Sequence, residues 1–115
     1  MRTPIAIGLI TVALALPAAA HHGWSNYDSS NRVSLTGTVT EVSYTQPHGT
    51  IRLEADGKTW LAVLAPPSRM SARGLSSTEL QTGIKATVEG YPSRNDPVEM
   101  RAERIIVNGK TIELR

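Results

Sequence analysis

From residue 32 onward, apolar and polar residues alternate with a period of two, which is the pattern of β-strands that bury one face. The first run, residues 33–40, places Val, Leu and Gly on one face and Ser and Thr on the other. The apolar positions then shift by one residue, to Val42 and Tyr44. Because such a shift exchanges the buried and exposed faces of a strand, we expect a bulge or a sharp coil near Thr40 and Glu41.

Further strands follow at short intervals, separated by residues that favour turns. The apolar pattern predicts strands over residues 50–55, 58–64, 84–90, 100–107 and 111–114. The pairs Asp56-Gly57 and Asn108-Gly109 are strong signals for two-residue hairpin turns. Both faces of the third strand are apolar, which favours a central position for it.

One short helix is expected between the third and fourth strands. Pro66-Pro67 ends the third strand, and residues 68–73 are predicted to form a helix with Ser68 as its N-cap and Gly74 just after its end. Three strands, a helical link and two or three further strands are the element order of an OB-type barrel. The predicted fold is therefore all-β, a small five- to six-stranded OB-like barrel, with an SH3-like barrel or an open β-sandwich as the alternatives.

The first twenty residues have the pattern of a secretory signal. Arg2 is followed by an apolar run over residues 5–16, and Ala18 and Ala20 occupy the −3 and −1 positions of a small-residue cleavage site. The apolar run is shorter than the roughly 20 residues that span a bilayer. We therefore expect a signal peptide at 1–20, cleaved after Ala20, a polar arm at 21–31, and a barrel domain at 32–115 in the periplasm. Trp24 and Tyr27 are expected to anchor the arm.

The composition of the chain argues against several classes of binding partner and of enzyme. The chain has no Cys, which excludes disulfides and thiolate metal sites. Without Arg2, eleven basic side chains remain against ten acidic ones, which is not the charge of a nucleic-acid-binding surface. No nucleophile elbow, phosphate-binding loop or His-Glu-x-x-His helix occurs. We expect a monomer that is not an enzyme, does not bind nucleic acid and does not insert into a membrane after processing.

The three histidines are the candidate metal ligands: His21 and His22 at the processed terminus, and His48 in the turn after the first strand. Cleavage after Ala20 leaves His21 with a free amine, so its amine and imidazole can chelate one ion while a second imidazole faces it. Nitrogen ligands of this kind favour Cu(II) among the available divalent metals. Cleavage after Ala19 would instead place His21 second and His22 third, a different arrangement that also binds copper.

A second candidate site is an aromatic and basic face on the barrel, of the kind with which OB folds bind oligosaccharides and other ligands. Its members are aromatic or arginine side chains near the strand ends: Tyr44, Arg69, Arg73, Tyr91 and Arg94. Arg69 and Arg73, together with Arg94, could clamp an anionic ligand through paired hydrogen bonds. The alternative is structural, with these arginines paired to Glu79, Glu99 or Glu103. Trp60 lies between apolar neighbours and is predicted to belong to the core.

Several segments together resemble a family of small exported bacterial proteins of unknown function. They are Ala-His-His-Gly-Trp at 20–24, Leu-Thr-Gly-Thr-Val at 35–39, Pro-His-Gly at 47–49, Ala-Pro-Pro-Ser-Arg-Met at 65–70, Arg-Gly-Leu at 73–75, Gly-Tyr-Pro-Ser-Arg at 90–94 and Met-Arg-Ala-Glu-Arg-Ile at 100–105. The resemblance implies a periplasmic β-barrel of OB type and brings no established activity.

The residues therefore predict an exported protein that binds copper, or another late first-row metal, through the processed N-terminal histidine. Its role would be to carry, buffer or deliver the metal, with another periplasmic protein as the partner for delivery. The alternative is a periplasmic OB-type module that binds a ligand or a protein and whose histidines are incidental.

Overall fold

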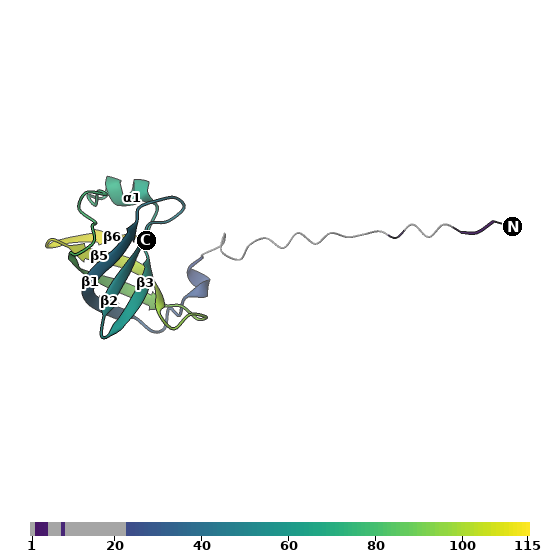
Figure 1. The fold of residues 1–115 in the computed structure, drawn as a ribbon, viewed down its shortest axis with the longest axis horizontal. Coiled ribbons are helices and arrows are strands. Elements are labelled where there is room, and N and C mark those ends of the chain that lie inside the picture. Colours follow the sequence, from purple (N-terminus) through teal and green to yellow (C-terminus); the bar gives the residue numbers. More distant parts are fainter. Residues whose placement is uncertain (1, 5–7, 9–22) are drawn as a thin grey trace.

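The computed structural model describes residues 2–4, 8 and 23–115. The secondary-structure elements in this part of the chain are η2 (Trp24–Asn26), β1 (Val33–Ser43), β2 (Thr50–Ala55), β3 (Lys58–Val63), α1 (Pro67–Ala72), β4 (Lys85–Pro92), β5 (Glu99–Val107) and β6 (Lys110–Glu113). Figure 1 shows the strands wrapped into a barrel, with α1 at one end. None of the helices within these residues has the length and apolarity needed to cross a bilayer.

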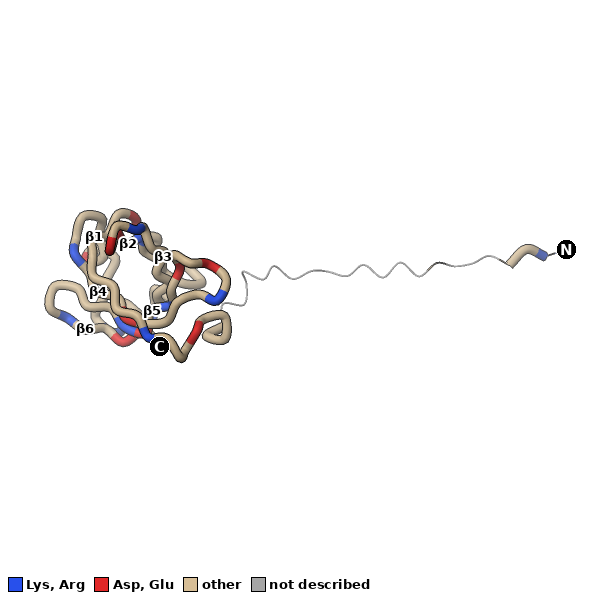
Figure 2. The backbone as a smooth tube through the Cα atoms, turned by 90° about the horizontal axis from the view of Figure 1, so that it is seen from below, with Lys and Arg blue, Asp and Glu red and all other residues tan. Residues whose placement is uncertain are grey.

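The strands form one sheet that closes on itself. The order is β3-β2-β1-β4-β5-β6, and a parallel pairing of β3 with the start of β5 closes the barrel, while β6 pairs with residues 104–107 at the end of β5. Figure 2 shows β1 to β5 arranged around a common interior. The predicted all-β barrel is confirmed: five strands close it, one extra strand is added, and one short helix lies between β3 and β4.

The two halves of the first strand pair with different neighbouring strands. Its register with β2 shifts between Val39 and Glu41, which confirms the predicted bulge. An added Cβ at Gly37 would lie 2.0 Å from the carbonyl oxygen of Glu54, so only glycine permits this approach of β1 to β2. The bulge lets the first half of β1 pair with β4 and the second half with β2.

Both predicted hairpin turns are present. Asp56 and Gly57 have φ values of 53° and 73°, and Asn108 and Gly109 have φ values of 51° and 74°. Two successive residues with positive φ are the requirement of a type I′ turn, which Asp-Gly and Asn-Gly satisfy at low steric cost. The first turn joins β2 to β3, and the second joins β5 to β6.

The predicted start of the helix was wrong by two residues. The N-cap is Pro66 rather than Ser68, and Pro67 occupies the first helical turn, where its missing N–H is not needed. The helix end matches the prediction. Gly74 has a φ of 98°, and the Leu75 amide donates to the carbonyl of Met70 over 2.8 Å, which is the Schellman arrangement.

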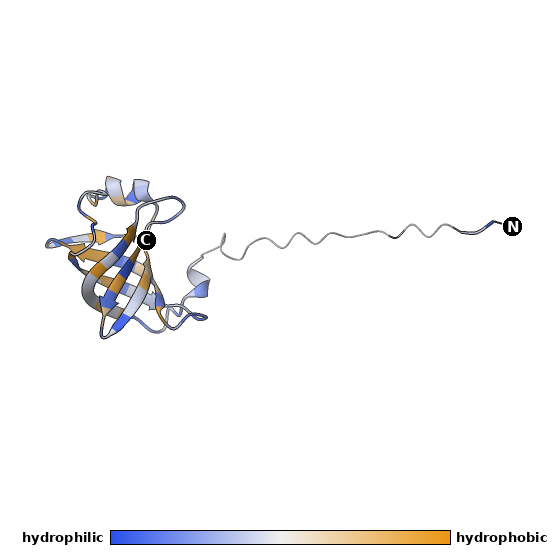
Figure 3. Ribbon diagram, in the orientation of Figure 1, coloured by the Kyte–Doolittle hydropathy of each residue, from blue (hydrophilic) through white to orange (hydrophobic). Residues whose placement is uncertain are grey.

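The core fills the barrel and extends under α1. The helical link, residues 64–84, contains α1 and joins β3 to β4. Its side chains Met70, Leu75 and Leu80 are buried together with the inward side chains of the strands. Figure 3 shows the hydrophobic residues concentrated along the strands. Trp60 is half-buried against this core, in line with its predicted place.

Candidate functional site

The N-terminal arm is bound to the barrel at the loop between β4 and β5, where Figure 1 shows η2 lying. Tyr27 forms a β-bridge with Ser93. The amide of Asp28 donates to the carbonyl of Pro92 over 2.9 Å, and the amide of Arg94 donates to the carbonyl of Asn26 over 3.0 Å. These backbone bonds hold the arm in place as an extension of the sheet.

Tyr27 is the buried anchor of the arm. Only 1% of it is exposed, and its hydroxyl donates to Oε2 of Glu99 over 3.0 Å. Burial raises the pKa of Tyr27 well above its ordinary value, and the carboxylate of Glu99 raises it further. The phenol therefore stays protonated and continues to donate to Glu99 at any pH near neutrality.

Trp24 is held by the two guanidinium groups of Arg101 and Arg115. Their central carbons lie 4.6 Å and 4.5 Å from the centroid of the indole ring. Tyr91 meets the same ring edge-on, with ring centroids 6.2 Å apart. Cation–π contacts are worth about 0.5–1 kcal/mol when exposed and more when desolvated. The prediction that Trp24 and Tyr27 anchor the arm is confirmed.

Arg101 is buried although it does not point into the barrel. Alternation along β5 places it on the same face as Glu99 and Glu103, while Met100 and Ala102 face the core. Only 4% of Arg101 is exposed, since the arm lies over this face of the strand. Burial lowers the pKa of Arg101, but guanidinium groups remain charged in proteins.

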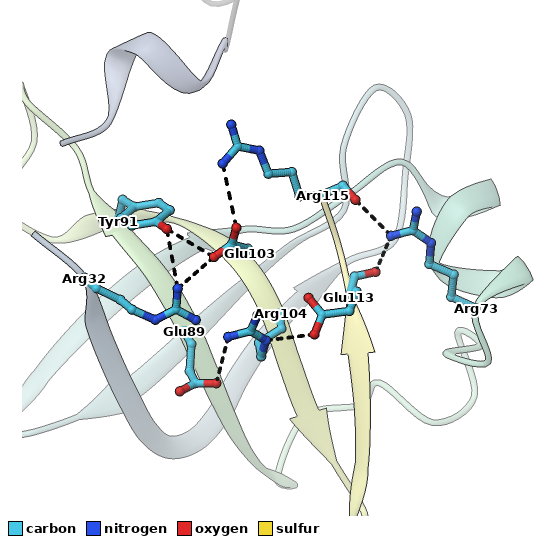
Figure 4. Close-up of polar contacts among 8 residues, drawn as sticks. All are labelled: Arg32, Arg73, Glu89, Tyr91, Glu103, Arg104, Glu113 and Arg115. Carbon is cyan, nitrogen blue, oxygen red and sulfur yellow. Dashed lines mark hydrogen bonds and ion pairs between the residues drawn. The ribbon is translucent and has the colours of Figure 1, made fainter. Parts of the chain in front are cut away.

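Glu103 connects the arginines around the arm, as Figure 4 shows. Its Oε2 accepts from Arg32 over 2.8 Å and from the hydroxyl of Tyr91 over 3.1 Å, and its Oε1 lies 3.7 Å from Arg115. Burial by itself raises the pKa of this carboxyl, but the hydrogen bonds from Arg32 and Tyr91 outweigh it. The net effect is a pKa below the ordinary value.

Acidification is expected to remove the stabilisation that Glu103 provides. Because its pKa is lower in the folded protein than the ordinary 4.5, the contribution is complete above that value and is lost as the pH falls through the folded pKa. The difference in melting temperature between the wild type and Glu103→Gln should be largest near neutral pH and shrink toward pH ~3. The pKa values of Asp28 and Glu79 are also lowered, but both groups titrate in the wild type and in the variant, so their contributions cancel in the difference. A difference that does not change with pH would contradict the expectation.

A cavity of about 290 Å³ lies between the arm and the barrel. Its lining is aromatic, hydroxylic and basic: Trp24, Ser25, Tyr27, Ser29, Tyr91, Arg94 and Arg115. The arm supplies the first four of these residues, and the end of β4, the following loop and the last residue of the chain supply the others. The cavity therefore exists only while the arm is bound.

The predicted ligand face is divided by the structure. Tyr91 and Arg94 line this cavity together. Tyr44 instead donates its hydroxyl to the carbonyl of Leu75 over 2.7 Å, beside α1. Tyr44 is therefore attached to the helical link.

Arg69 of α1 and Arg73, its C-cap residue, hold the C-terminal segment, residues 113–115. Arg69 donates to the carbonyl of Leu114 over 3.0 Å, and Arg73 donates to the carbonyls of Glu113 and Arg115, as Figure 4 shows for Arg73. The structural alternative, in which they pair with glutamates, was wrong about the acceptors, which are backbone oxygens. These bonds position Arg115 for its contact with Trp24.

The histidines are covered only in part by the structure. His21 and His22 lie outside the described residues. His48 is half-buried after the cis bond between Gln46 and Pro47, and it already takes part in a polar, ring or electrostatic interaction. Within residues 2–4, 8 and 23–115, no group of three or more His, Cys, Asp or Glu side chains is placed to hold a metal ion.

Sequence reasoning missed three members of this region: Ser25, Ser29 and Arg115. These residues gave no signal, since short polar and charged side chains are common at any surface.

Comparison with known proteins adds a family and a fold. Residues 9–100 match a protein-family profile described as a family of unknown function (DUF6152). No match was found among curated protein sequences. The chain is similar to two crystal structures of TiaS, one of a ZRD-deleted mutant in complex with agmatine and one of a complex with an isoleucine tRNA and ATP.

The similarity to TiaS concerns the fold alone. The agmatine complex gives a TM-score of 0.55 at 16% identity over 76% of this chain and 27% of that chain. The tRNA complex gives a TM-score of 0.53 at 16% identity over 77% of this chain and 20% of that chain. This chain thus spans less than a third of either protein.

Proposed function

The chain belongs to DUF6152, a family of unknown function, and we propose that it is an exported protein that binds copper, or another late first-row metal, through its N-terminal arm. In this proposal the signal is removed after Ala20 in the periplasm. The new terminus, His21, supplies its amine and imidazole. The protein then carries, buffers or delivers the metal as a monomer, without catalysis.

The observation that supports this proposal is the anchoring of Trp24 and Tyr27 on the barrel. Trp24 follows His21 by three residues, and consecutive Cα atoms are about 3.8 Å apart, so the Cα of His21 lies within about 11 Å of that of Trp24. A terminus tethered this closely meets the folded domain at high effective concentration. Coordination of the metal by a second ligand, from the barrel, then loses less entropy than it would if the terminus were a free tail.

The surrounding charges determine which ligands the metal would need. Arg101 and Arg115 lie against Trp24, and their positive charges repel any metal cation that approaches this part of the arm. A metal ion must therefore gain its binding energy from direct coordinate bonds to neutral nitrogen atoms. Cu(II) forms the strongest of these bonds among first-row divalent ions. His21 would supply two nitrogens, His48 the facing imidazole, and His22 a further or alternative ligand.

Copper titration of the protein purified from periplasm tests the proposal. Intact mass first establishes whether the chain begins at His21. One equivalent of Cu(II) should bind, and the spectrum of the bound metal should report nitrogen ligands. His48→Ala should weaken binding by at least about tenfold, because one coordinate bond is lost while the terminus is unchanged.

A variant with three residues other than histidine added before His21 provides the second arm of this test, because the free amine then no longer belongs to a histidine and no histidine stands second or third in the chain. Binding should again weaken, while the melting temperature without metal should not change. A copper affinity that is unaffected by His48→Ala and by the added residues would contradict the proposal, since an unstructured histidine-containing peptide would give the same result.

The second candidate function is a binding module with incidental histidines. The cavity between the arm and the barrel favours it, because aromatic rings and arginines converge there on an open volume of about 290 Å³. Binding sites for small molecules are typically concave and carry a few convergent polar groups. In this alternative the arm is the lid of a ligand site.

A further inference from the structure

We propose that the cavity between the arm and the barrel binds a small molecule bearing an oxyanion, either a carboxylate or a phosphate, with Arg94 and Arg115 as its direct partners. The proposal rests on the binding-module function and gives its ligand class. It does not depend on metal binding by the histidines.

The charge of the lining is the first argument. Arg94 and Arg115 are the charged side chains among the described residues that line the cavity, and both are positive. The carboxylates nearby do not line it. Glu99 accepts from Tyr27, and Asp28 accepts from Ser30. Glu103 accepts from Arg32 and Tyr91, and its contact with Arg115 is the longer one, at 3.7 Å.

The donors available to a ligand are the second argument. Arg94 donates its Nε to the carbonyl of Ser25 over 3.2 Å, and within residues 23–115 its terminal nitrogens make no hydrogen bond. Arg115 keeps 55% of its side chain exposed, and its ion pair with Glu103 is long, at 3.7 Å. Guanidinium groups with free terminal nitrogens bind carboxylates and phosphates through paired hydrogen bonds.

The hydroxyl groups of the arm add neutral donors. Ser25 and Ser29 line the cavity, and their hydroxyl groups make no hydrogen bond to any other described residue. Hydroxyl groups beside guanidinium groups complete the coordination of an oxyanion, whose oxygens accept more hydrogen bonds than two arginines can supply.

The walls of the cavity are held in place without a ligand. Arg101 and Arg115 contact Trp24, and the hydroxyl of Tyr91 lies between Arg32 and Glu103. Side chains that are already positioned lose little entropy on binding. The volume of about 290 Å³ is near the lower end of the range for ligand pockets, so a single small acid fits better than a polymer.

The test is an NMR titration of ¹⁵N-labelled, metal-stripped protein, with inorganic phosphate and succinate as anionic probes and glucose as the uncharged probe. Sodium chloride at matched ionic strength is the reference. We expect saturable shifts at the Nε–Hε group of Arg94 and at the amides of Ser25 and Ser29, with at least one of the two anions. Comparison of the two anions identifies the group that is recognised.

Variants separate a built site from nonspecific attraction. Arg94→Gln and, independently, Arg115→Gln should weaken binding by about tenfold or more, the expected loss for a charge-assisted hydrogen bond. Arg52→Gln is the matched control, because Arg52 of β2 pairs with the exposed Glu41 of β1 and does not line the cavity. Amide spectra of each variant show whether the arm remains bound.

Three results would overturn the anion proposal: shifts no larger than those in sodium chloride, an affinity in Arg94→Gln or Arg115→Gln equal to that of the wild type, or a loss of affinity in Arg52→Gln as large as in those two variants. Saturable shifts with glucose alone would overturn the ligand class while leaving the binding module in place. Absence of shifts with all three probes would overturn both. Repeating the titration with His48→Ala keeps these outcomes separate from the copper proposal.

Discussion

Replacing Gly90 by alanine is expected to destabilise the protein by about 3 kcal/mol or more, the upper part of the range for overpacked sites. A Cβ at this position would lie 1.9 Å from the carbonyl oxygen of Arg101 and 2.8 Å from the Cα of Ala102. Both atoms belong to the backbone of β5, so no side-chain rotation relieves the contact. The register between β4 and β5 shifts between Glu89 and Gly90, so the two strands approach at a bulge.

The measurement is the free energy of unfolding from urea denaturation, with Gly23→Ala as the matched control. Gly23 has a φ of −74°, and its added Cβ would meet only the hydroxyl oxygen of Ser25, at 3.7 Å. That substitution should leave the stability unchanged or raise it slightly, because alanine restricts the unfolded chain. A Gly90→Ala protein as stable as the wild type would show that the bulge can open at low cost.

Replacing Tyr27 by alanine is expected to release the arm from the barrel. Truncation of a fully buried aromatic side chain costs about 3–5 kcal/mol, and only 1% of Tyr27 is exposed. Because the arm is an appendage of the closed barrel, the loss should appear as local opening rather than as complete unfolding. The amides of residues 26–28 should exchange about a hundredfold faster, which corresponds to a loss of about 3 kcal/mol.

Tyr27→Phe is the control for the hydrogen bond alone. It keeps the ring and removes the bond to Glu99, so we expect a loss of about 1 kcal/mol and an arm that stays bound. Hydrogen exchange and limited proteolysis after Arg32 or Arg94 report arm release, while exchange in β1 and β4 reports the barrel. Fast exchange of the barrel strands in Tyr27→Ala would contradict the view that the barrel is stable without the arm.

Much of the barrel could be predicted because its signals are local. Alternation located the strands, and Asp56-Gly57 and Asn108-Gly109 located two hairpins, since positive φ at two successive positions strongly restricts the residue types. The bulge in β1 appeared in the sequence as a one-residue shift of the apolar positions. The helix N-cap was missed because Ser68 and the Pro66-Pro67 pair are both acceptable starts, and local preference does not distinguish them.

The candidate site could be predicted only in pieces. The arm, its two aromatic anchors, and Tyr91 and Arg94 were identified from the chain, but as members of different features. Tyr44, Arg69 and Arg73 do not join this site. Tyr44 binds the helical link, and the two arginines bind the C-terminal segment, because of where α1 lies relative to β6.

The sequence by itself determined the strands, the turns and the fold class, because each of these follows from steric preference and periodicity within a few residues. Only the tertiary structure decided that the arm lies on the outer face of β5, and that Trp24 meets Arg101 and Arg115 from the other end of the described chain. Such contacts depend on barrel closure, which brings together residues far apart in sequence. Their positions follow from the register of every strand between them, so no local pattern encodes them.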